Sequence, residues 1–505
     1  MRLPIAISRL NRIAWLSALA LAGCLSAATS VDPATGTADQ FFGVDKVYAF
    51  HLTMTAEQYN KLEPPGGGGM ARPGVSGDDR YPASTASLEF EGRTWGTLTL
   101  RYKGNSSYRS AGALKRPLKL EFQGAGDTKD KDRTFFGMAK INLNNNAMDA
   151  SQMREALGYE VFRREGVPAA RTAFAKLYIT VPGRYDNQYA GLYTVVEQID
   201  QTFFKDRFGK KAGPVVKPEG LSGMPYLGED WNAWLVRYGA KSTDKINPED
   251  ANRFMAFVKF VNQASDEDFA KHIGEYVDVD EFLHFLAVEV ALVNLDSPLG
   301  MNHNYYITVN PKTQKVTWIP WDLNLAFGGF GGGGRGGGGG NPPQDLSVNR
   351  PAAKGQMPLA DRLLAIPEVL ARYDEIVRTL VTKNFTEKRV SELMELMAGA
   401  IRSSVKTDTA VSYAQFERHM ATDPSTVTLV DAAPVNNSFP GGGGFGGRGG
   451  GRGGPGNNAP PLRQFIPLRI ESVLEQLDGK REGFTSSGRG GGRGGFGGPR
   501  GGFGN

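Results

Sequence analysis

Residues 318–328 read WIPWDLNLAFG. Asp322 is its one charged residue, and the residues on both sides of it are apolar enough to be buried. Because burying an unpaired carboxylate is costly, we expect a positive charge beside Asp322. A divalent cation would supply that charge, and a salt bridge to an arginine is the alternative. We therefore predict that Asp322 is a metal ligand.

The sequence around this stretch has mainly helical periodicity. Apolar residues recur every three or four positions in 249–264 and 279–295, which is typical of helices. A β-hairpin formed by 304–308 and 315–319 leads into Asp322. Downstream, amphipathic helices are predicted over 358–382, 386–404 and 461–478.

Further upstream, short alternating runs predict strands. These runs are 47–53, 87–90, 97–103, 116–122, 173–181 and 189–197. Between them, a helix is expected to start near Asp149 or Ser151 and to run to Glu165, because Asp149 and Gln152 resemble a capping box. A strand-rich part followed by a helical part predicts the α+β class.

Six motifs in this order resemble the CotH (spore coat protein H) kinase-like family. They are RYKGNSS (101–107), PLKLEF (117–122), MRE with FRREG (153–155 and 162–166), GLYTVVEQID (191–200), HNYYI (303–307) and IPWDLNLAFG (319–328). The resemblance implies an atypical two-lobed protein-kinase-like fold with a strand-rich N-lobe and a helical C-lobe. It also implies transfer of the ATP γ-phosphate to Ser or Thr of a protein, with Mg²⁺ or Mn²⁺ as the metal.

Phosphoryl transfer needs a cation for the phosphates and an acid that orients this cation. Lys119 lies in the middle of a strand, with its ammonium opposite the apolar face, and Lys103 is the competing lysine. Glu155 shares a helix side with apolar residues four and seven positions later, so it needs a partner such as Lys119. The alternatives are a solvated strand lysine and an ordinary first-turn glutamate.

The other candidate residues follow the analogy with kinases. Glu197 ends a strand at the expected hinge, where backbone groups would bind adenine. Asp296 leaves a buried helix into a loop, where a catalytic aspartate accepts the proton of the substrate hydroxyl. Simple helix termination would favour a cation at that position. Asn304 resembles the second metal ligand, with Asn302 as a substitute, and the family often has an acid at the position of Asn324.

The N-terminus is predicted to be a bacterial lipoprotein signal peptide. Three arginines precede the apolar run 13–23, which is too short to span a bilayer as a helix. The segment ends in Leu-Ala-Gly-Cys24, which resembles a lipobox, and Cys24 is the single cysteine of the chain. We expect Cys24 to carry lipid, including palmitate, and to anchor the exported protein to the outer membrane or cell surface. Simple cleavage near Ala27 is the alternative.

Glycine-rich tracts interrupt an otherwise ordinary globular composition. The long tracts, 328–340, 441–456 and 488–504, are expected to be disordered, because glycine loses much conformational entropy on ordering. They contain arginines and no acid, so they account for much of the net charge of +5, and the remaining body is mildly acidic. Their RGG and FGG boxes are a pattern that binds RNA, but export makes nucleic acid an unlikely partner. Flexible spacers are the simpler interpretation.

The predicted domains follow from these boundaries. They are a signal peptide (1–23), a linker (24–44), the N-lobe (45–200), the C-lobe (201–480, with inserts 328–341 and 440–460) and a tail (481–505). The predicted function is an exported kinase that acts on a surface or coat protein at the cell envelope. The alternative is a non-catalytic surface-assembly or binding lipoprotein with the same fold, since an exported compartment contains little ATP. The zinc-hydrolase, serine-hydrolase and P-loop motifs are missing from the sequence.

Overall fold

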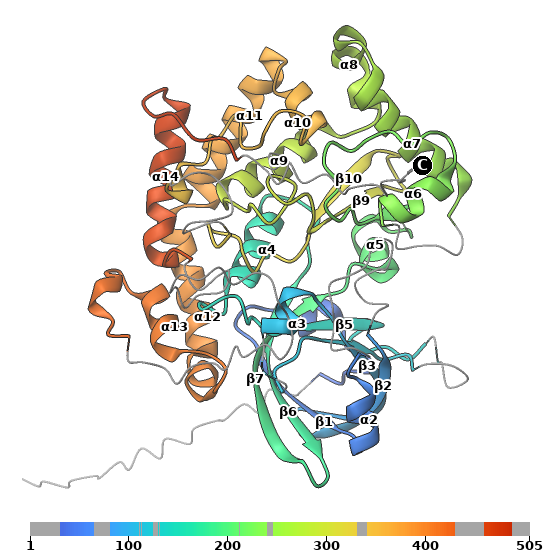
Figure 1. Cartoon of the computed structure of the whole chain (residues 1–505), viewed down its shortest axis with the longest axis vertical. Helices are drawn as coiled ribbons and strands as arrows, with labels where there is room; N and C mark the ends of the chain where they lie inside the picture. Colours follow the sequence, from blue (N-terminus) through green and yellow to red (C-terminus); the bar gives the residue numbers. More distant parts are fainter. Residues whose placement is uncertain are drawn as a thin grey trace, which may run out of the picture.

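The computed structural model describes residues 31–64, 81–110, 112, 114–124, 130, 132–211, 213–239, 246–330, 341–429 and 459–486. Figure 1 shows a barrel of strands at one end of the molecule and a larger helical part at the other, with helix α4 (Arg154–Arg164) between them. The predicted signal peptide, Cys24, most of the glycine-rich inserts and most of the tail lie outside the described residues.

Seven strands close the barrel in the order β1-β2-β3-β4-β5-β7-β6. Neighbouring strands are antiparallel, except that β1 and β6 run parallel where the barrel closes. The strands are β1 (Val47–Thr53), β2 (Ala83–Phe90), β3 (Arg93–Tyr102), β4 (Leu118–Glu121), β5 (Lys140–Asn144), β6 (Thr172–Val181) and β7 (Tyr185–Glu197). Short helices α1 (Ala38–Phe41), α2 (Ala56–Lys61) and α3 (Ser106–Ser110) flank them.

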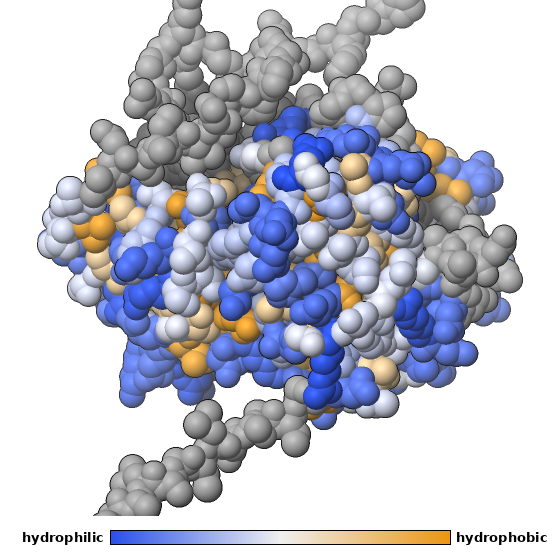
Figure 2. All heavy atoms as spheres, turned by 90° about the horizontal axis from the view of Figure 1, so that it is seen from below, coloured by the Kyte–Doolittle hydropathy of each residue, from blue (hydrophilic) through white to orange (hydrophobic). Residues whose placement is uncertain are grey.

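Alternation along each strand sorts the side chains between the inside and the outside of the barrel. In β4, Leu118 and Leu120 belong to the apolar core inside the barrel, so Lys119 between them faces outward. Figure 2 views the molecule from below the barrel of Figure 1 and shows mainly hydrophilic residues, with apolar residues in small separate groups. The barrel therefore keeps most of its apolar side chains inside.

The helical part is organised around α9 (Val279–Ala291), which is buried along most of its length and contacts α4. A small sheet of order β10-β9-β8 lies beside it. Its strands are β8 (Val215–Val216), β9 (Tyr305–Val309) and β10 (Val316–Pro320). The helices are α5 (Gln201–Phe208), α6 (Trp231–Arg237), α7 (Pro248–Gln263), α8 (Asp266–His272), α10 (Pro358–Leu363), α11 (Pro367–Thr379), α12 (Glu387–Thr407), α13 (Tyr413–Met420) and α14 (Leu462–Leu477). Single turns are η2 (Ile273–Glu275), η3 (Pro343–Asp345), η4 (Leu380–Asn384) and η5 (Pro424–Thr426).

The segment after Asp322 ends against the segment that resumes beyond 331–340. A Cβ at Gly328 would lie 2.9 Å from Cβ of Pro343 and 3.1 Å from Cε2 of Phe465, a residue of α14. Glycine at this position therefore allows a close approach of the chain on either side of the tract.

The α+β prediction is confirmed, because strands form the first half of the described chain and helices most of the second. The predicted range 47–53 coincides with β1, and 249–264 is one residue from α7 at each end. The closed barrel and β5 were not predicted. Closure depends on pairing β1 with β6, which are more than a hundred residues apart, and no local pattern encodes such a pairing. Within the described residues, no helix is both long and apolar enough to cross a bilayer.

A buried ion pair fastens the barrel to the end of α12. Asp408, the residue after α12, accepts hydrogen bonds from Nζ of Lys115 at 2.5 Å and from the backbone N–H of Leu192 at 2.8 Å. Both charged side chains are nearly inaccessible to solvent. A Cβ at Gly191 would lie 2.6 Å from the Asp408 carboxylate, so the contact requires a residue without a side chain in β7.

Replacing Lys115 by Met should therefore destabilise the protein strongly. The change leaves the Asp408 carboxylate buried without its cation, which costs about 3–5 kcal/mol in comparable buried pairs. Calorimetry should show a markedly lower melting temperature.

The matched control for this experiment is Lys140→Met. Lys140 forms a half-exposed pair with Glu121 at 3.4 Å, and such pairs contribute at most about 1 kcal/mol. Equal melting temperatures of the two variants would show that the buried pair of Lys115 and Asp408 does not stabilise the contact between the barrel and α12.

Candidate functional site

The outer face of the barrel presents polar side chains to helix α4. Lys103, the residue after β3, donates from Nζ to Oδ1 of Asn144 at 2.7 Å. Asn144, the last residue of β5, donates from Nδ2 to both carboxylate oxygens of Glu155, at 2.8 and 2.9 Å. One amide thus links a barrel lysine to a buried glutamate of α4, and each end of the amide faces the charge that it can bind.

The start of α4 is tied to the rest of the molecule by the residue before Glu155. Arg154 is buried, and its backbone N–H donates to the Asp149 carboxylate at 2.8 Å. The helix begins later than predicted, and its N-cap is Met153, so the predicted capping box of Asp149 and Gln152 is not formed. The Arg154 guanidinium contacts the Asp149 carboxylate at 3.0 Å, the carbonyl of Ala326 at 3.1 Å and the carbonyl of Pro460 at 2.7 Å. These contacts join α4 to the segment that follows Asp322.

Asp322 lies in a sharp turn directly after β10 and is partly exposed. Its φ of +54° is in the left-handed region, which aspartate tolerates better than most residues. Its backbone N–H donates to the hydroxyl of Tyr159 at 3.1 Å, and Tyr159 lies one helical turn beyond Glu155. The turn is therefore held directly against α4.

Burial and charge together disfavour ionisation of both acids. Burial raises the pKa of Glu155 to about 8, and the charge of Asp322 adds to the effect, while Asn144 and Lys103 oppose it. Burial also raises the pKa of Asp322, with Lys103 opposing the rise and Asp296 contributing to it. A nearby cation would stabilise the ionised forms of Glu155 and Asp322. The arrangement is therefore suited to a positively charged ligand.

Asp296 lies in the turn after α9 and is held on both carboxylate oxygens. Nε2 of His303 is 2.6 Å from Oδ1, and Nδ2 of Asn304 donates to Oδ2 at 3.0 Å and to the Asp296 carbonyl at 2.9 Å. Burial opposes protonation of His303, but the hydrogen bond and charge of Asp296 outweigh it and raise the pKa of His303. Asn302, the alternative to Asn304, donates its backbone N–H to Ser297.

Lys217 is a second lysine near Asp322, and it was not identified from the sequence. It follows the two-residue strand β8, and its Nζ is 2.5 Å from Glu219. Its charge is among those that oppose the rise in the pKa of Asp322. Such a short strand has no recognisable periodicity, which is why Lys217 could not be identified from the sequence.

Two other predicted residues are placed differently. Lys119 lies on the same outer face of the barrel as Lys103, but its strand partner is Asn142, which donates to the carbonyl of Val196. Glu197 is buried, and its carboxylate forms ion pairs with Arg171 and Arg207. Lys103 is thus the lysine whose hydrogen bond to Asn144 connects it to Glu155. The Glu197 side chain is part of a separate ion-pair network.

The side-chain oxygens near Asp322 suit a cation that is also coordinated by the phosphates of a nucleotide. In the described parts of the chain, no three His, Cys, Asp or Glu side chains form a metal cage. Asp322 offers a carboxylate, and Asn304 has its amide nitrogen on Asp296, so its amide oxygen is available. The Trp321 N–H donates to the Asn304 carbonyl at 3.0 Å, which keeps the two segments adjacent. Mg²⁺ commonly binds to one or two protein ligands together with phosphate oxygens, so these residues fit Mg²⁺ or Mn²⁺.

Comparison with known proteins places all of these residues in one family domain. The family model described as CotH kinase protein matches residues 100–427. The inner spore coat protein H of Bacillus subtilis (strain 168) is 25% identical over 284 residues, which cover 55% of this chain and 71% of that protein. Cys24 lies before the matched region.

Replacing Glu155 by Gln should reduce the loss of stability at alkaline pH. The pKa of Glu155 is raised from 4.5 to about 8, so across this range the folded state keeps a proton that the unfolded state has lost. Stability from this group is therefore complete below about 4.5 and is lost as the pH rises through about 8. The variant lacks this loss, so its melting temperature should exceed that of the wild type at a pH of about 8.5.

An exposed glutamate in the first turn of α11, Glu368, provides the control. Glu368→Gln should leave the pH profile of the melting temperature unchanged. Parallel profiles for wild type and E155Q would show that Glu155 does not hold the proton.

Proposed function

This chain belongs to the CotH kinase family, and from that premise we propose that it is an exported phosphotransferase. It transfers the γ-phosphate of ATP to a serine or threonine of a protein at the cell envelope. The observation that carries the proposal is the meeting of the Lys103–Asn144–Glu155 network with Asp322, close to Asp296. These groups come from four separate stretches of the sequence and have the chemistry that phosphoryl transfer requires.

Lys103 and Glu155 form the phosphate-binding pair in this proposal. Lys103 supplies the positive charge, and Glu155 orients it through the Asn144 amide. Lys119, on the same face of the barrel, is the second candidate for the phosphates. Asp322 and Asn304 hold the divalent ion. ATP and its Mg²⁺ or Mn²⁺ supply the phosphoryl group and the charge that offsets it.

Asp296 receives the acceptor hydroxyl in this proposal. His303 and Asn304 hold its carboxylate on both oxygens, so the group keeps one orientation. It accepts a hydrogen bond from the hydroxyl and takes up the proton as the hydroxyl oxygen becomes the nucleophile. The hydrogen bond and the charge of Asp296 raise the pKa of His303, so a protonated imidazole is favoured at this position.

The proposed arrangement is that of a two-lobed kinase. The barrel acts as the N-lobe and the helical part as the C-lobe, and residues 197–200 act as the hinge, where backbone groups bind adenine. The position of α4 between the two parts supports this assignment, since α4 carries Glu155, which is linked to Lys103 through the Asn144 amide.

We also propose that the protein is attached to the cell envelope. Residues 1–23 direct export, and Cys24 carries the lipid that holds the protein at a bacterial membrane. The name of the Bacillus relative describes a spore coat component, which supports a surface location. The same name favours the second candidate function, a non-catalytic assembly protein that retains the fold.

Purified protein should incorporate labelled γ-phosphate into itself or an acceptor protein when Mg²⁺ or Mn²⁺ is present. Asp296→Asn should lower the rate at least about 100-fold, the usual contribution of a positioned base. Asp322→Asn and Lys103→Met should each lower it by at least about 100-fold as well, because each removes a charge that stabilises the transferred phosphoryl group. Nucleotide binding, measured by the nucleotide-dependent thermal shift, should weaken in K103M and D322N and persist in D296N.

Asp280→Asn, which removes an exposed carboxylate paired with Arg372, is the matched control and should retain full activity. Absence of both transfer and a nucleotide-dependent thermal shift in the wild type would refute the kinase proposal and support the assembly protein.

Lipid attachment is tested separately. Cells grown with a palmitate analogue should label the wild-type protein, and the label should disappear in Cys24→Ala together with sedimentation in the membrane fraction. An unlabelled wild type, or a C24A chain that still sediments with membranes, would contradict anchoring through Cys24.

A further inference from the structure

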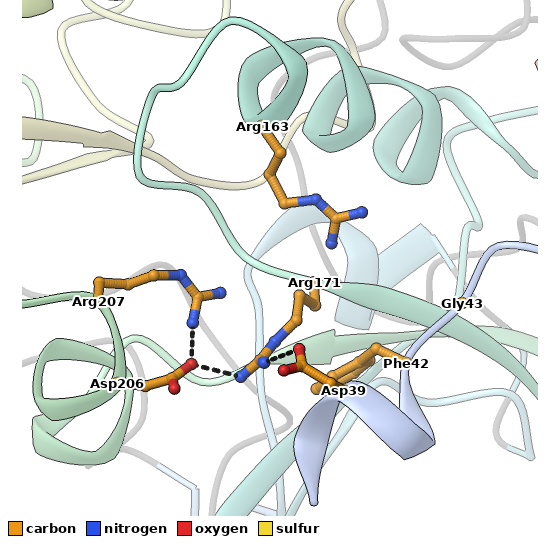
Figure 3. A pocket seen from close by; sticks show the side chains of 7 residues that line it. All are labelled: Asp39, Phe42, Gly43, Arg163, Arg171, Asp206 and Arg207. Atoms are coloured by element: carbon orange, nitrogen blue, oxygen red, sulfur yellow. Dashed lines mark hydrogen bonds and ion pairs between the residues drawn. The ribbon is translucent and has the colours of Figure 1, made fainter.

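A second hollow, remote in the sequence from Asp322 and Asp296, is lined by three arginines. Its volume is about 440 Å³, and it lies where α1, the last turn of α4, the start of β6 and α5 converge. Figure 3 shows Arg171 and Arg207 both reaching Asp206, while Arg163 extends from α4 toward the hollow without a drawn contact. Nothing in the proposed phosphotransfer uses this hollow.

The inner layer of the hollow has more positive than negative charge. Arg171 and Arg207 share one buried carboxylate, Glu197, whose Oε2 accepts from Nε of Arg171 at 3.1 Å and from Nη2 of Arg207 at 2.9 Å. Arg163 adds a third guanidinium beside them. Two guanidinium groups therefore contact Glu197, and the third, that of Arg163, is paired with Glu160.

Arg163 is the least satisfied of the three. Among the described residues, its single ion-pair partner is Glu160, which it shares with Arg164. Burial lowers the pKa of Arg163 to about 10, and repulsion from Arg207 and Arg171 adds to the effect. Figure 3 draws no interaction between Arg163 and the other residues that line the hollow. Its guanidinium therefore lies in a positive field with donors to spare.

The acids at the rim are held weakly. The side chain of Asp39 is 82% exposed and pairs with Arg171, and that of Asp206 is 48% exposed and pairs with both Arg171 and Arg207. Exposed ion pairs are screened by water and contribute little, so these carboxylates can turn outward to solvent. An anion that enters the hollow has only these two groups to displace.

We propose that this arginine pocket binds a phosphate monoester or inorganic phosphate. A phosphate that displaces Asp39 and Asp206 would take over the ion pairs that these two carboxylates make with Arg171 and Arg207, and guanidinium groups bind phosphate oxygens in pairs. The ligand is either a soluble phosphate compound or the headgroup of a lipid such as phosphatidic acid. Asp39 follows Cys24 by 15 residues. An extended chain of that length reaches roughly 50 Å, so a lipid-anchored chain could place the pocket at a membrane surface.

Calorimetric titration of the full chain with inorganic phosphate at a pH of about 7.5 tests the pocket. The wild type should bind, and Arg163→Met should bind at least about 10-fold more weakly. Arg164→Met is the matched control, because Arg164 shares Glu160 but does not line the hollow. Asp39→Asn should bind several-fold more tightly, because a competing carboxylate is removed.

Two comparisons keep this result separate from the proposed function. Asp322→Asn should bind phosphate as the wild type does, since it alters the other site. Melting temperatures of the variants check that R163M is folded. A wild type that binds no phosphate, or an R163M chain that binds equally well, would overturn the proposal.

Vesicles identify the source of the phosphate. In a C24A background, phosphatidylcholine vesicles containing phosphatidic acid are compared with vesicles containing phosphatidylserine, whose phosphate is a diester. Stronger sedimentation with phosphatidic acid that is lost on Arg163→Met indicates the lipid headgroup. Equal sedimentation, together with phosphate binding in solution, indicates a soluble ligand.

Discussion

The placement of two carboxylates, Glu155 and Asp322, at the junction of barrel and helices is the constraint on which the site depends. Burial disfavours the ionised form of both acids there, because it raises the pKa of each. Lys103 and the Asn144 amide offset part of this cost, and they do so from strands of the barrel. The barrel, α4 and the turn after β10 must therefore meet correctly for the charges to be tolerated. Fold and chemistry are coupled at this point.

Much of the architecture could be read from local patterns. Alternation predicted β1 and most of β6, and three- to four-residue spacing predicted α7, α9, α12 and α14. The apolar context of Asp322 indicated a carboxylate that is costly to bury, and the structure places it beside Glu155, Lys103 and Asp296. The closed barrel was beyond such patterns, because it is completed by β5 and by pairing between distant strands.

The sequence did not determine which of two lysines, Lys103 or Lys119, is linked to Glu155. Lys119 lies in the middle of a strand pattern, with apolar neighbours on the opposite face, whereas Lys103 is the last residue of the predicted run 97–103 and follows the end of β3. Which of them reaches α4 depends on how far each strand extends along the barrel. Asn144, the bridging amide, belongs to the strand that was missed, so the link between Lys103 and Glu155 could not be anticipated. Lys217 and the role of His303 were hidden for the same reason, since both depend on tertiary contacts.

The buried Arg154 and the close contact at Gly328 affect how freely the lengths of the two inserts can change. Arg154 holds the carbonyls of Ala326 and Pro460, and Gly328 lies against Pro343, so both junctions of the 331–340 insert and the far junction of the 430–458 insert are pinned. For a chain with pinned ends, doubling the length costs only about 0.6 kcal/mol. Changes in the length of either insert can therefore leave the residues around Asp322 in register.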